Sequence, residues 1–161
     1  MPGQTILPPT LGTELGHILS LRNPAIQQTN DITVTIGDGI RTEADATYQA
    51  TVVHALKSVK DNLSIGVRLE LDTLGTGGNT VAGFSAGMEA RYETDNLFVS
   101  GIAGYHRDVD DATRSFEAGI GLGAYITPNL NVCSELLLGY TGKSGNEGLE
   151  HAFVVTANYS F

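Results

Sequence analysis

From residue 32 to its last residue, the chain alternates between apolar and polar side chains in eight successive segments. This alternation restricts the fold more than any other feature, because a period of two residues places unlike side chains on the two faces of a β-strand. In segment 63–74, Ile65, Val67 and Leu69 share one face, while Arg68 and Glu70 share the other. The eight segments are 32–41, 47–59, 63–74, 80–92, 97–108, 115–127, 130–141 and 151–161. They predict an all-β fold of eight strands.

Short and longer connectors alternate between these segments. The short connectors are residues 60–62, 94–96 and 128–129, and the longer ones are residues 42–46, 75–79, 109–114 and 142–150. Asp61-Asn62-Leu63, Asp95-Asn96-Leu97 and Pro128-Asn129-Leu130 recur at spacings of 34 and 33 residues, which indicates a string of similar hairpins. Such a string predicts an antiparallel up-and-down meander. Pairing of segment 32–41 with segment 151–161 would close it into a barrel without free edges.

Composition and glycine placement indicate that the apolar face points outward. Charged residues make up 17% of the chain, below the roughly 25% of ordinary globular domains. Many glycines fall on the polar face, where they would fit the crowded interior of a narrow barrel. They are Gly66, Gly83, Gly87, Gly104, Gly119, Gly121, Gly123 and Gly139. We therefore expect residues 32–161 to form an eight-stranded antiparallel β-barrel of the transmembrane type.

Aromatic residues on the apolar face gather near the ends of the predicted strands. Tyr48, Tyr105, Phe116, Tyr140 and Phe153 lie near the rim with the longer connectors, and Tyr92, Tyr159 and Phe161 lie near the opposite rim. Two aromatic belts separated by aliphatic residues are typical of a barrel in a bilayer, because these rings favour the interfacial layers. Most segments also exceed the roughly 9–11 residues that a tilted strand needs to cross.

The polar face carries charged residues that would point into the barrel. They are Lys57, Arg68, Glu70, Glu89, Arg91, His106, Glu117 and Glu135. In so narrow an interior, side chains fill the space and opposite charges pair, and we expect Arg68 and Glu135 at similar depth. The predicted network consists of Arg68, Glu70, Glu89, Arg91, Glu117 and Glu135. We interpret it as a structural plug without an open channel, the alternative being an ion path or an acid–base site.

Segment 47–59 fits the pattern poorly. If its apolar residues Tyr48, Ala50, Val52 and Leu56 face lipid, then His54 does so too, near the middle of the membrane, where a charge is costly. A bulge in this strand or a neutral, partnered histidine would resolve the conflict. The sequence does not choose between these solutions.

Motifs for nucleotide or metal chemistry fail on their context. The glycine-rich run 119–123 lies inside a predicted strand with no helix after it, and residues 75–79 lack the Lys-Ser/Thr pair of a phosphate-binding loop. Asp108, Asp110 and Asp111 begin like a calcium loop, but the twelfth position is Gly119 rather than Glu. We expect a solvated acidic loop there, and neither a metal site nor a cofactor.

Enzymatic and nucleic-acid functions are also not expected. His106 and Asp108 share a face and could form an acid–base pair like that of barrel acyltransferases, but no motif places a serine beside them. Cys133 is the single cysteine, which excludes a disulfide framework. The net charge of −9 argues against a nucleic-acid partner, because phosphate neutralisation needs a basic face.

The end of the chain carries a family resemblance. Its apolar positions in alternation are Phe153, Val155, Ala157, Tyr159 and Phe161. This pattern resembles the C-terminal signal strand of bacterial outer-membrane barrels. Residues 32–161 as a whole resemble the small eight-stranded outer-membrane barrels of the OmpX, Ail, Lom and opacity-protein type. The resemblance implies a bacterial outer-membrane location, contact with membrane lipid, assembly by the barrel-assembly machinery, and a structural or interaction role.

Residues 1–31 lack the alternation and leave alternatives open. Leu11, Leu15, Ile18 and Leu19 fall at helical spacing, so a short amphipathic helix within an N-terminal extension is one expectation. Residues 1–9 do not read as a secretory signal peptide, which leaves the export route undecided. A second hypothesis is a barrel built into a bacteriophage virion or other large assembly, docked to a protein partner through residues 1–31. A third is a soluble lipocalin-like carrier, which would bury its apolar face.

Overall fold

The computed structural model describes residues 32–43, 46–74, 80–109, 114–141 and 148–161. Eight strands account for almost all of them: β1 Ile32–Thr42, β2 Thr47–Lys60, β3 Leu63–Leu74, β4 Thr80–Glu93, β5 Leu97–Asp108, β6 Arg114–Tyr125, β7 Leu130–Thr141 and β8 Gly148–Ser160. The predicted segments match these bounds to within three residues. No helix in the described ranges is long and apolar enough to cross a membrane. The predicted extension, residues 1–31, lies outside the described residues.

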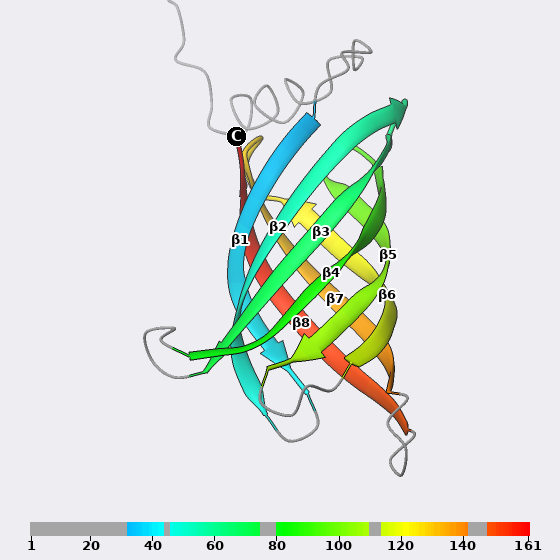
Figure 1. Cartoon of the computed structure of the whole chain (residues 1–161). Helices are drawn as coiled ribbons and strands as arrows, with labels where there is room; N and C mark the ends of the chain where they lie inside the picture. The colour runs from blue at the N-terminus through cyan, green and yellow to red at the C-terminus, as the bar shows by residue number, and fades with distance from the viewer. Residues whose placement is uncertain (1–31, 44–45, 75–79, 110–113, 142–147) are drawn as a thin grey trace, which may run out of the picture.

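The strands pair in sequence order into a closed barrel, in which β1 and β8 complete the ring (Figure 1). Every neighbouring pair is antiparallel, so the predicted meander is confirmed. The short connectors and the C-terminus share one end of the barrel, the upper end in Figure 1, which we call the turn end. The opposite end, where β1 stops at Thr42 and β2 starts at Thr47, is the loop end.

The strand registers determine the tilt of the barrel. Following hydrogen-bonded partners from Ile32 once around all eight strands leads to Thr42, ten residues further along β1. An offset of this size in an eight-stranded barrel corresponds to a strand tilt of about 40–45°. The interior of such a barrel is just wide enough to be filled by side chains.

The repeated asparagines of the short connectors make one recurring contact. The carbonyl groups of Asn62, Asn96 and Asn129 accept hydrogen bonds from backbone N–H groups near the end of the following hairpin, at 2.8–2.9 Å. Asn62 also adopts a left-handed backbone conformation with φ of 66°, which asparagine tolerates better than most residues. The repeat therefore links each turn to the next around the turn end.

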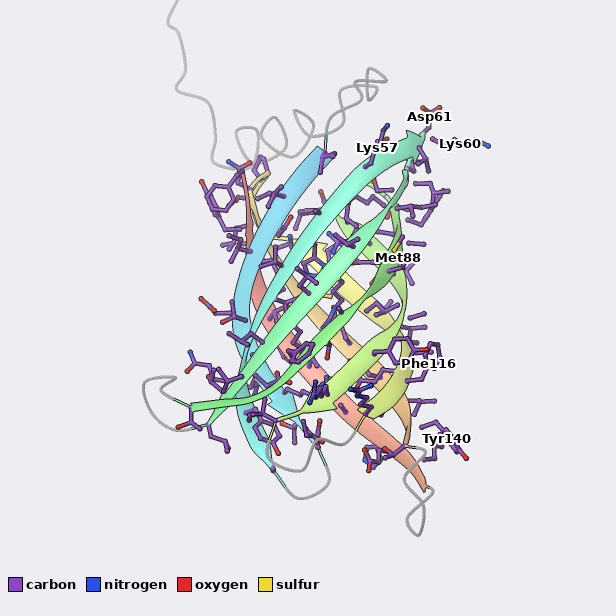
Figure 2. The ribbon with its side chains drawn as sticks, viewed as in Figure 1. Lys57, Lys60, Asp61, Met88, Phe116 and Tyr140 are labelled. Atoms are coloured by element: carbon purple, nitrogen blue, oxygen red, sulfur yellow. The ribbon has the colours of Figure 1, made fainter. Side chains whose placement is uncertain are left out.

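Strand β3 shows which face lies inside. Ile65, Val67 and Leu69 are 40%, 44% and 50% exposed, whereas Arg68 and Glu70 are 2% and 3% exposed. The other strands continue the apolar outer face, and Met88, Phe116 and Tyr140 are seen pointing away from the barrel in Figure 2. A soluble carrier would have the reverse arrangement, so the lipocalin-like hypothesis is wrong.

Strand β2 corrects the sequence prediction. Its residues Ala50, Val52, His54 and Leu56 all lie inside, while Lys57, expected in the interior, is exposed on the outer face near the turn end. The physical reason is that both faces of β2 are partly apolar, so its own alternation specifies the register weakly. Pairing with β1 and β3 fixes the orientation instead, and it places His54 beside polar partners in the interior.

Interior glycines provide room for side chains and for close strand approach. A Cβ atom on Gly123 would lie 2.0 Å from the ring of Phe98, and one on Gly66 would lie 1.9 Å from the carbonyl oxygen of Ala55. At Gly139 a Cβ atom would meet nothing nearer than 3.7 Å. The interior is thus crowded near the turn end and open beside Gly139, toward the loop end.

Among the residues that the structure describes, the charged side chains of the outer face lie near its two ends, with one exception. Lys57 and Lys60 are at the turn end in Figure 2, and Arg107 and Arg114 are cross-strand neighbours at the loop end. Asp38, however, is exposed about halfway along the outer face, where the hydroxyl of Thr51 donates a 2.8 Å hydrogen bond to it. The outer face is otherwise an apolar band between two charged margins.

Candidate functional site: the charged interior and its mouth

Most of the charged residues of the interior form two connected groups, whose members come from several strands of the barrel. Each side chain points inward because it occupies the polar phase of an alternating strand. The loop-end group lies toward the loop end of the barrel, and the turn-end group lies toward the turn end. Apart from Glu43, which is partly exposed, the members of both groups are almost completely buried, so their charges depend on partners within the protein.

The loop-end group is built around Arg41 of β1. Its Nε atom donates to Glu43 at 2.6 Å, its Nη1 atom donates to Glu70 at 3.3 Å, and its Nη2 atom donates to Glu117. Asp72 lies 3.9 Å from the same Nε atom. One guanidinium therefore connects β1, β3 and β6 across the interior.

Arg68 extends this group toward the turn end. Its Nη2 atom contacts both Glu70, at 2.6 Å, and Glu135 of β7, while its Nε atom donates to Glu135 at 3.3 Å. The sequence prediction that Arg68 and Glu135 lie at similar depth is confirmed. Glu70 is shared by Arg68 and Arg41, so these contacts run without a break from β7 to β1.

The turn-end group is built around Glu89. His54 Nδ1 donates to its Oε2 atom at 2.5 Å, and Arg91 Nε donates to its Oε1 atom at 3.0 Å. The guanidinium of Arg91 in turn lies 4.2 Å from the centroid of the Phe98 ring, a cation–π contact. His54 is therefore partnered, as one of the two solutions considered for the sequence required, but on the inside rather than in lipid.

Charge is distributed unequally between these groups. In the turn-end group, one arginine and one histidine face one glutamate. In the loop-end group, two arginines face five carboxylates: Glu43, Glu70, Asp72, Glu117 and Glu135. The excess of negative charge is therefore concentrated toward the loop end.

A cavity of about 300 Å³ opens beside the loop-end group. It is lined by Arg41, Glu43, Ala46, Tyr48, His106, Asp108, Ser115, Glu117, Gly139, Leu149, Glu150, His151 and Ala152. The small residues Gly139 and Ala152 form part of its wall, which agrees with the open space found at Gly139. Four of its lining residues are acidic, so the cavity is a negatively charged mouth of the barrel.

A serine accompanies His106 and Asp108 in the structure. Ser85 Oγ lies 2.8 Å from His106 Nδ1, and His106 Nε2 lies 3.0 Å from Asp108. Ser85 and His106 are direct cross-strand partners on β4 and β5, a relation that no sequence motif encodes. The surrounding carboxylates oppose the negative charge that develops on a substrate oxygen during acyl transfer, so this row fits a structural role better than a catalytic one.

Metal and thiol chemistry find little support within the described ranges. These residues contain no group of three or more histidine, cysteine or acidic side chains that could hold a metal ion. Asp110 and Asp111 of the predicted acidic loop lie outside them. Cys133 is buried in the interior, and burial raises the cost of forming the reactive thiolate.

The predicted aromatic belts are placed as follows. Tyr105 and Phe116 contact each other edge to face at 5.6 Å on the outer face near the loop end, and Tyr159 and Phe161 do so at 5.2 Å near the turn end. Tyr92, Tyr140 and Phe153 are also exposed on the outer face. Tyr48 is not part of the belt, because it lies on the inner face of β2 and lines the cavity.

Sequence reasoning missed Arg41 as an interior residue, and it left Asp72 and Ser85 out of the predicted network although both lie on the polar faces of their segments. Arg41 stands at the end of its segment, next to a predicted loop, and the pattern in segment 32–41 is interrupted by Asp38. Its place in the alternation with Thr35, Gly37 and Gly39 was the available signal. The pairing of Arg41 with Glu117 needs the barrel closure, which no local pattern reports.

Comparison with known proteins supports the fold. No protein family described by sequence matches the chain, and no curated protein matches it. The chain is similar to neisserial surface protein A (NspA), with a TM-score of 0.52 and 14% identity over 80% of this chain and 94% of that one. It is similar to the outer-membrane protein Ail of Yersinia pestis, with a TM-score of 0.52 and 11% identity over 81% of this chain and all of that one.

A third similar structure is the N-terminal β-barrel domain of OprF from Pseudomonas aeruginosa, with a TM-score of 0.50 and 16% identity over 83% of this chain and all of that domain. At these identities the likeness concerns the fold. The chain has the fold of the small eight-stranded outer-membrane barrels, as the resemblance predicted.

Proposed function

We propose that the chain is an integral outer-membrane β-barrel with a structural or interaction role, and that its interior is closed by paired polar side chains. The observation that carries this proposal is the inversion of faces on β3, where Val67 and Leu69 are exposed and Arg68 and Glu70 are buried. An exposed apolar band around the whole barrel is stable in lipid and unfavourable in water. The fold shared with outer-membrane barrels supports the same conclusion.

The charged margins of the apolar band support a membrane orientation. Long cationic side chains such as Lys57 and Arg107 can keep their charged ends in the interfacial layers while their stems cover apolar surface. The aromatic pairs Tyr105–Phe116 and Tyr159–Phe161 occupy the corresponding levels. We propose that the band between these levels is the lipid-contacting surface.

We propose that the interior is sealed and conducts poorly. Arg41 and Arg68 bridge opposite walls through Glu70, Glu117 and Glu135, and they fill the cross-section of a barrel whose interior admits little besides side chains. The exposed alternating residues of β8 and Phe161, which follows this strand, are proposed to act as the assembly signal that the outer-membrane assembly machinery reads. Those residues are Phe153, Val155, Ala157, Tyr159 and Phe161.

The test is to refold the full chain with and without lipid vesicles. We expect a compact species whose electrophoretic mobility changes on heating, formed only with lipid or detergent, and near-zero conductance in planar bilayers. A chain that stays dispersed and folded without detergent would contradict the membrane proposal. Stepwise ion currents from the purified chain would contradict the sealed interior. The virion hypothesis depends on residues 1–31, and no described residue favours it.

A further inference from the structure

Asp38 places a carboxyl group on the outer face of the barrel, at a depth where such groups are rare and usually functional in membrane proteins. It is exposed on β1, and its cross-strand partners are Thr51 of β2 and Ala157 of β8. On β8 the belt residues Tyr159 and Phe153 stand on either side of Ala157, so Asp38 lies between the two aromatic levels. This inference rests on the proposed membrane location, which puts Asp38 near the middle of the hydrocarbon layer.

The barrel itself provides little compensation for this carboxyl group. Within the part of the chain that the structure describes, the contact found for it is the 2.8 Å hydrogen bond donated by Thr51, although a carboxylate can accept about four. The lysine and arginine side chains of the described outer face lie at its two ends, and they are Lys57, Lys60, Arg107 and Arg114. A bare carboxylate in hydrocarbon is far more costly than a protonated, hydrogen-bonded carboxyl group. Asp38 therefore calls for a hydrogen-bonding partner from outside the barrel.

Polar groups continue from Asp38 toward the loop end. Thr51 and Gln49 follow each other on the outer face of β2. Gln49 is one strand across from Asp38, about 4.8 Å, and two residues nearer the loop end, about 6.6 Å. At a strand tilt of about 40–45° these two displacements run in opposite directions around the barrel and nearly cancel. Asp38 and Gln49 are thus aligned along the barrel axis, and we call Asp38, Thr51 and Gln49 the polar seam.

This alignment favours a second copy of the chain as the partner. A two-fold axis along the membrane normal brings groups of equal depth together, so groups that are aligned along the barrel axis meet their own counterparts. An amide group and a protonated carboxyl group each donate and accept hydrogen bonds, and each can therefore pair with a copy of itself. Ala157, beside Asp38, is small and allows the two outer faces to approach closely.

We propose that the chain forms a two-fold dimer in the membrane through the polar seam, in which Asp38 pairs with Asp38 of the second copy and Gln49 pairs with Gln49. Reciprocal hydrogen bonds satisfy the two carboxyl groups in hydrocarbon, where water does not compete for them. The hydroxyl of Thr51 holds each carboxyl group from its own chain. In a single barrel diluted in excess lipid, Asp38 lacks this partner and remains unfavourable.

The experiment measures energy transfer between donor-labelled and acceptor-labelled full chains, refolded together in phosphatidylcholine vesicles over a range of protein-to-lipid ratios. We expect more transfer than randomly distributed acceptors give, and a decrease when unlabelled chain is added. Asp38→Val should raise the dissociation constant roughly tenfold, whereas Asp38→Asn, whose amide also pairs with its own copy, should retain association. The matched control is Ser134→Val, which removes an outward polar group from β7 and should leave association unchanged.

Gln49 provides an independent readout of the same interface. In a Cys133→Ser background, which removes the native thiol, Gln49→Cys should form a disulfide-linked dimer in the vesicles on mild oxidation. Met88→Cys, on the outer face of β4, should not. Equal cross-linking of both variants would indicate random collision and would overturn the assignment of the polar seam.

Insertion is followed separately by the heat-dependent change in electrophoretic mobility. A chain that does not insert would contradict the membrane location itself. An inserted native chain that shows only random transfer would overturn the dimer while leaving the membrane location intact. Undiminished association of Asp38→Val, or an equal weakening by Ser134→Val, would also overturn it. Association of Asp38→Asn as weak as that of Asp38→Val would exclude self-pairing at this position.

Discussion

His54 Nδ1 lies 2.5 Å from Glu89 Oε2 inside the barrel, although the two residues belong to strands β2 and β4 and are separated by β3. The residue of β3 opposite Glu89 is Gly66, which leaves that part of the inner wall without a side chain. Arg91 contacts the same glutamate from the other side at 2.8 Å. The group connects non-adjacent strands, so we expect it to matter for stability.

Removing Glu89 should strongly destabilise the barrel. In Glu89→Ala, His54 and Arg91 remain buried without their carboxylate, and loss of one member of a buried charged pair costs about 3–5 kcal/mol. The measurement is the free energy of unfolding in urea with the protein in lipid vesicles. Lys57→Ala is the control, because Lys57 lies outside on the same strand as His54; a similar loss in that variant would contradict the assignment.

The outward carboxylate of Asp38 should lower stability in a bilayer. It lies about halfway along β1 on the outer face, where the Thr51 hydroxyl donates a hydrogen bond to it. Asp38→Val removes a group that is unfavourable in hydrocarbon, and we expect unfolding to become more difficult by about 1–2 kcal/mol. The readout is again urea unfolding in vesicles, compared with Asp61→Val at the turn end. A less stable Asp38→Val barrel would show that Asp38 has a partner of its own.

The position of His54 also shows what the sequence could and could not predict. The eight strands, their order and the outward apolar face followed from alternation and connector length, because each strand records its own two faces. The sequence of strand β2 does not distinguish its two faces, since His54 shares a face with Ala50 and Val52. Only the pairing of β2 with both neighbouring strands decides which of its faces points inward.

Contacts across the interior were predictable only where depth could be counted. Arg68 and Glu135 sit near the middle of long, regular strands, and their common level could be estimated. The contacts of Arg41 with Glu117, and of Ser85 with His106, depend on the ten-residue offset of the closed barrel and on pairing geometry. Neither quantity appears in any local sequence pattern.

The aromatic end of β8 should be required for assembly. Replacing Tyr159 and Phe161 with serine removes an outward edge-to-face pair and the terminal apolar positions. We expect little or no heat-modifiable protein in the outer-membrane fraction. The matched control changes Tyr105 and Phe116 to serine, the aromatic pair of the loop end. Normal assembly of the first variant would contradict the assembly signal, and an equal defect in the control would indicate a requirement for aromatic residues in general.

Two interior glycines should respond differently to the same substitution. A methyl group at Gly66 would lie 1.9 Å from a backbone carbonyl oxygen, which cannot move without the strand, whereas at Gly139 the nearest atom is 3.7 Å away. We expect Gly66→Ala to destabilise by about 1–3 kcal/mol and Gly139→Ala to be nearly neutral. Unfolding in vesicles measures both, and equal effects would contradict the packing described for β3.

The row Ser85–His106–Asp108 can be tested directly for nucleophilic reactivity. Ser85 and Asp108 lie at hydrogen-bond distance from His106 as in a serine hydrolase, but with the ring nitrogens exchanged, since Ser85 contacts Nδ1 and Asp108 contacts Nε2. Glu70 is the cross-strand neighbour of Ser85, Asp72 lies 3.8 Å from His106, and Glu117 lines the same cavity, so negative charge opposes both the attack and the intermediate that follows. We therefore expect no covalent adduct on Ser85 after incubation of the refolded barrel with a fluorophosphonate probe, measured by mass spectrometry of the intact chain. The Ser85→Ala variant, which removes the candidate nucleophile, sets the background. An adduct on the native chain that is missing from Ser85→Ala, and missing again from His106→Gln, would mean that the histidine activates the serine despite its surroundings, and the interior would then have to be considered a catalytic site.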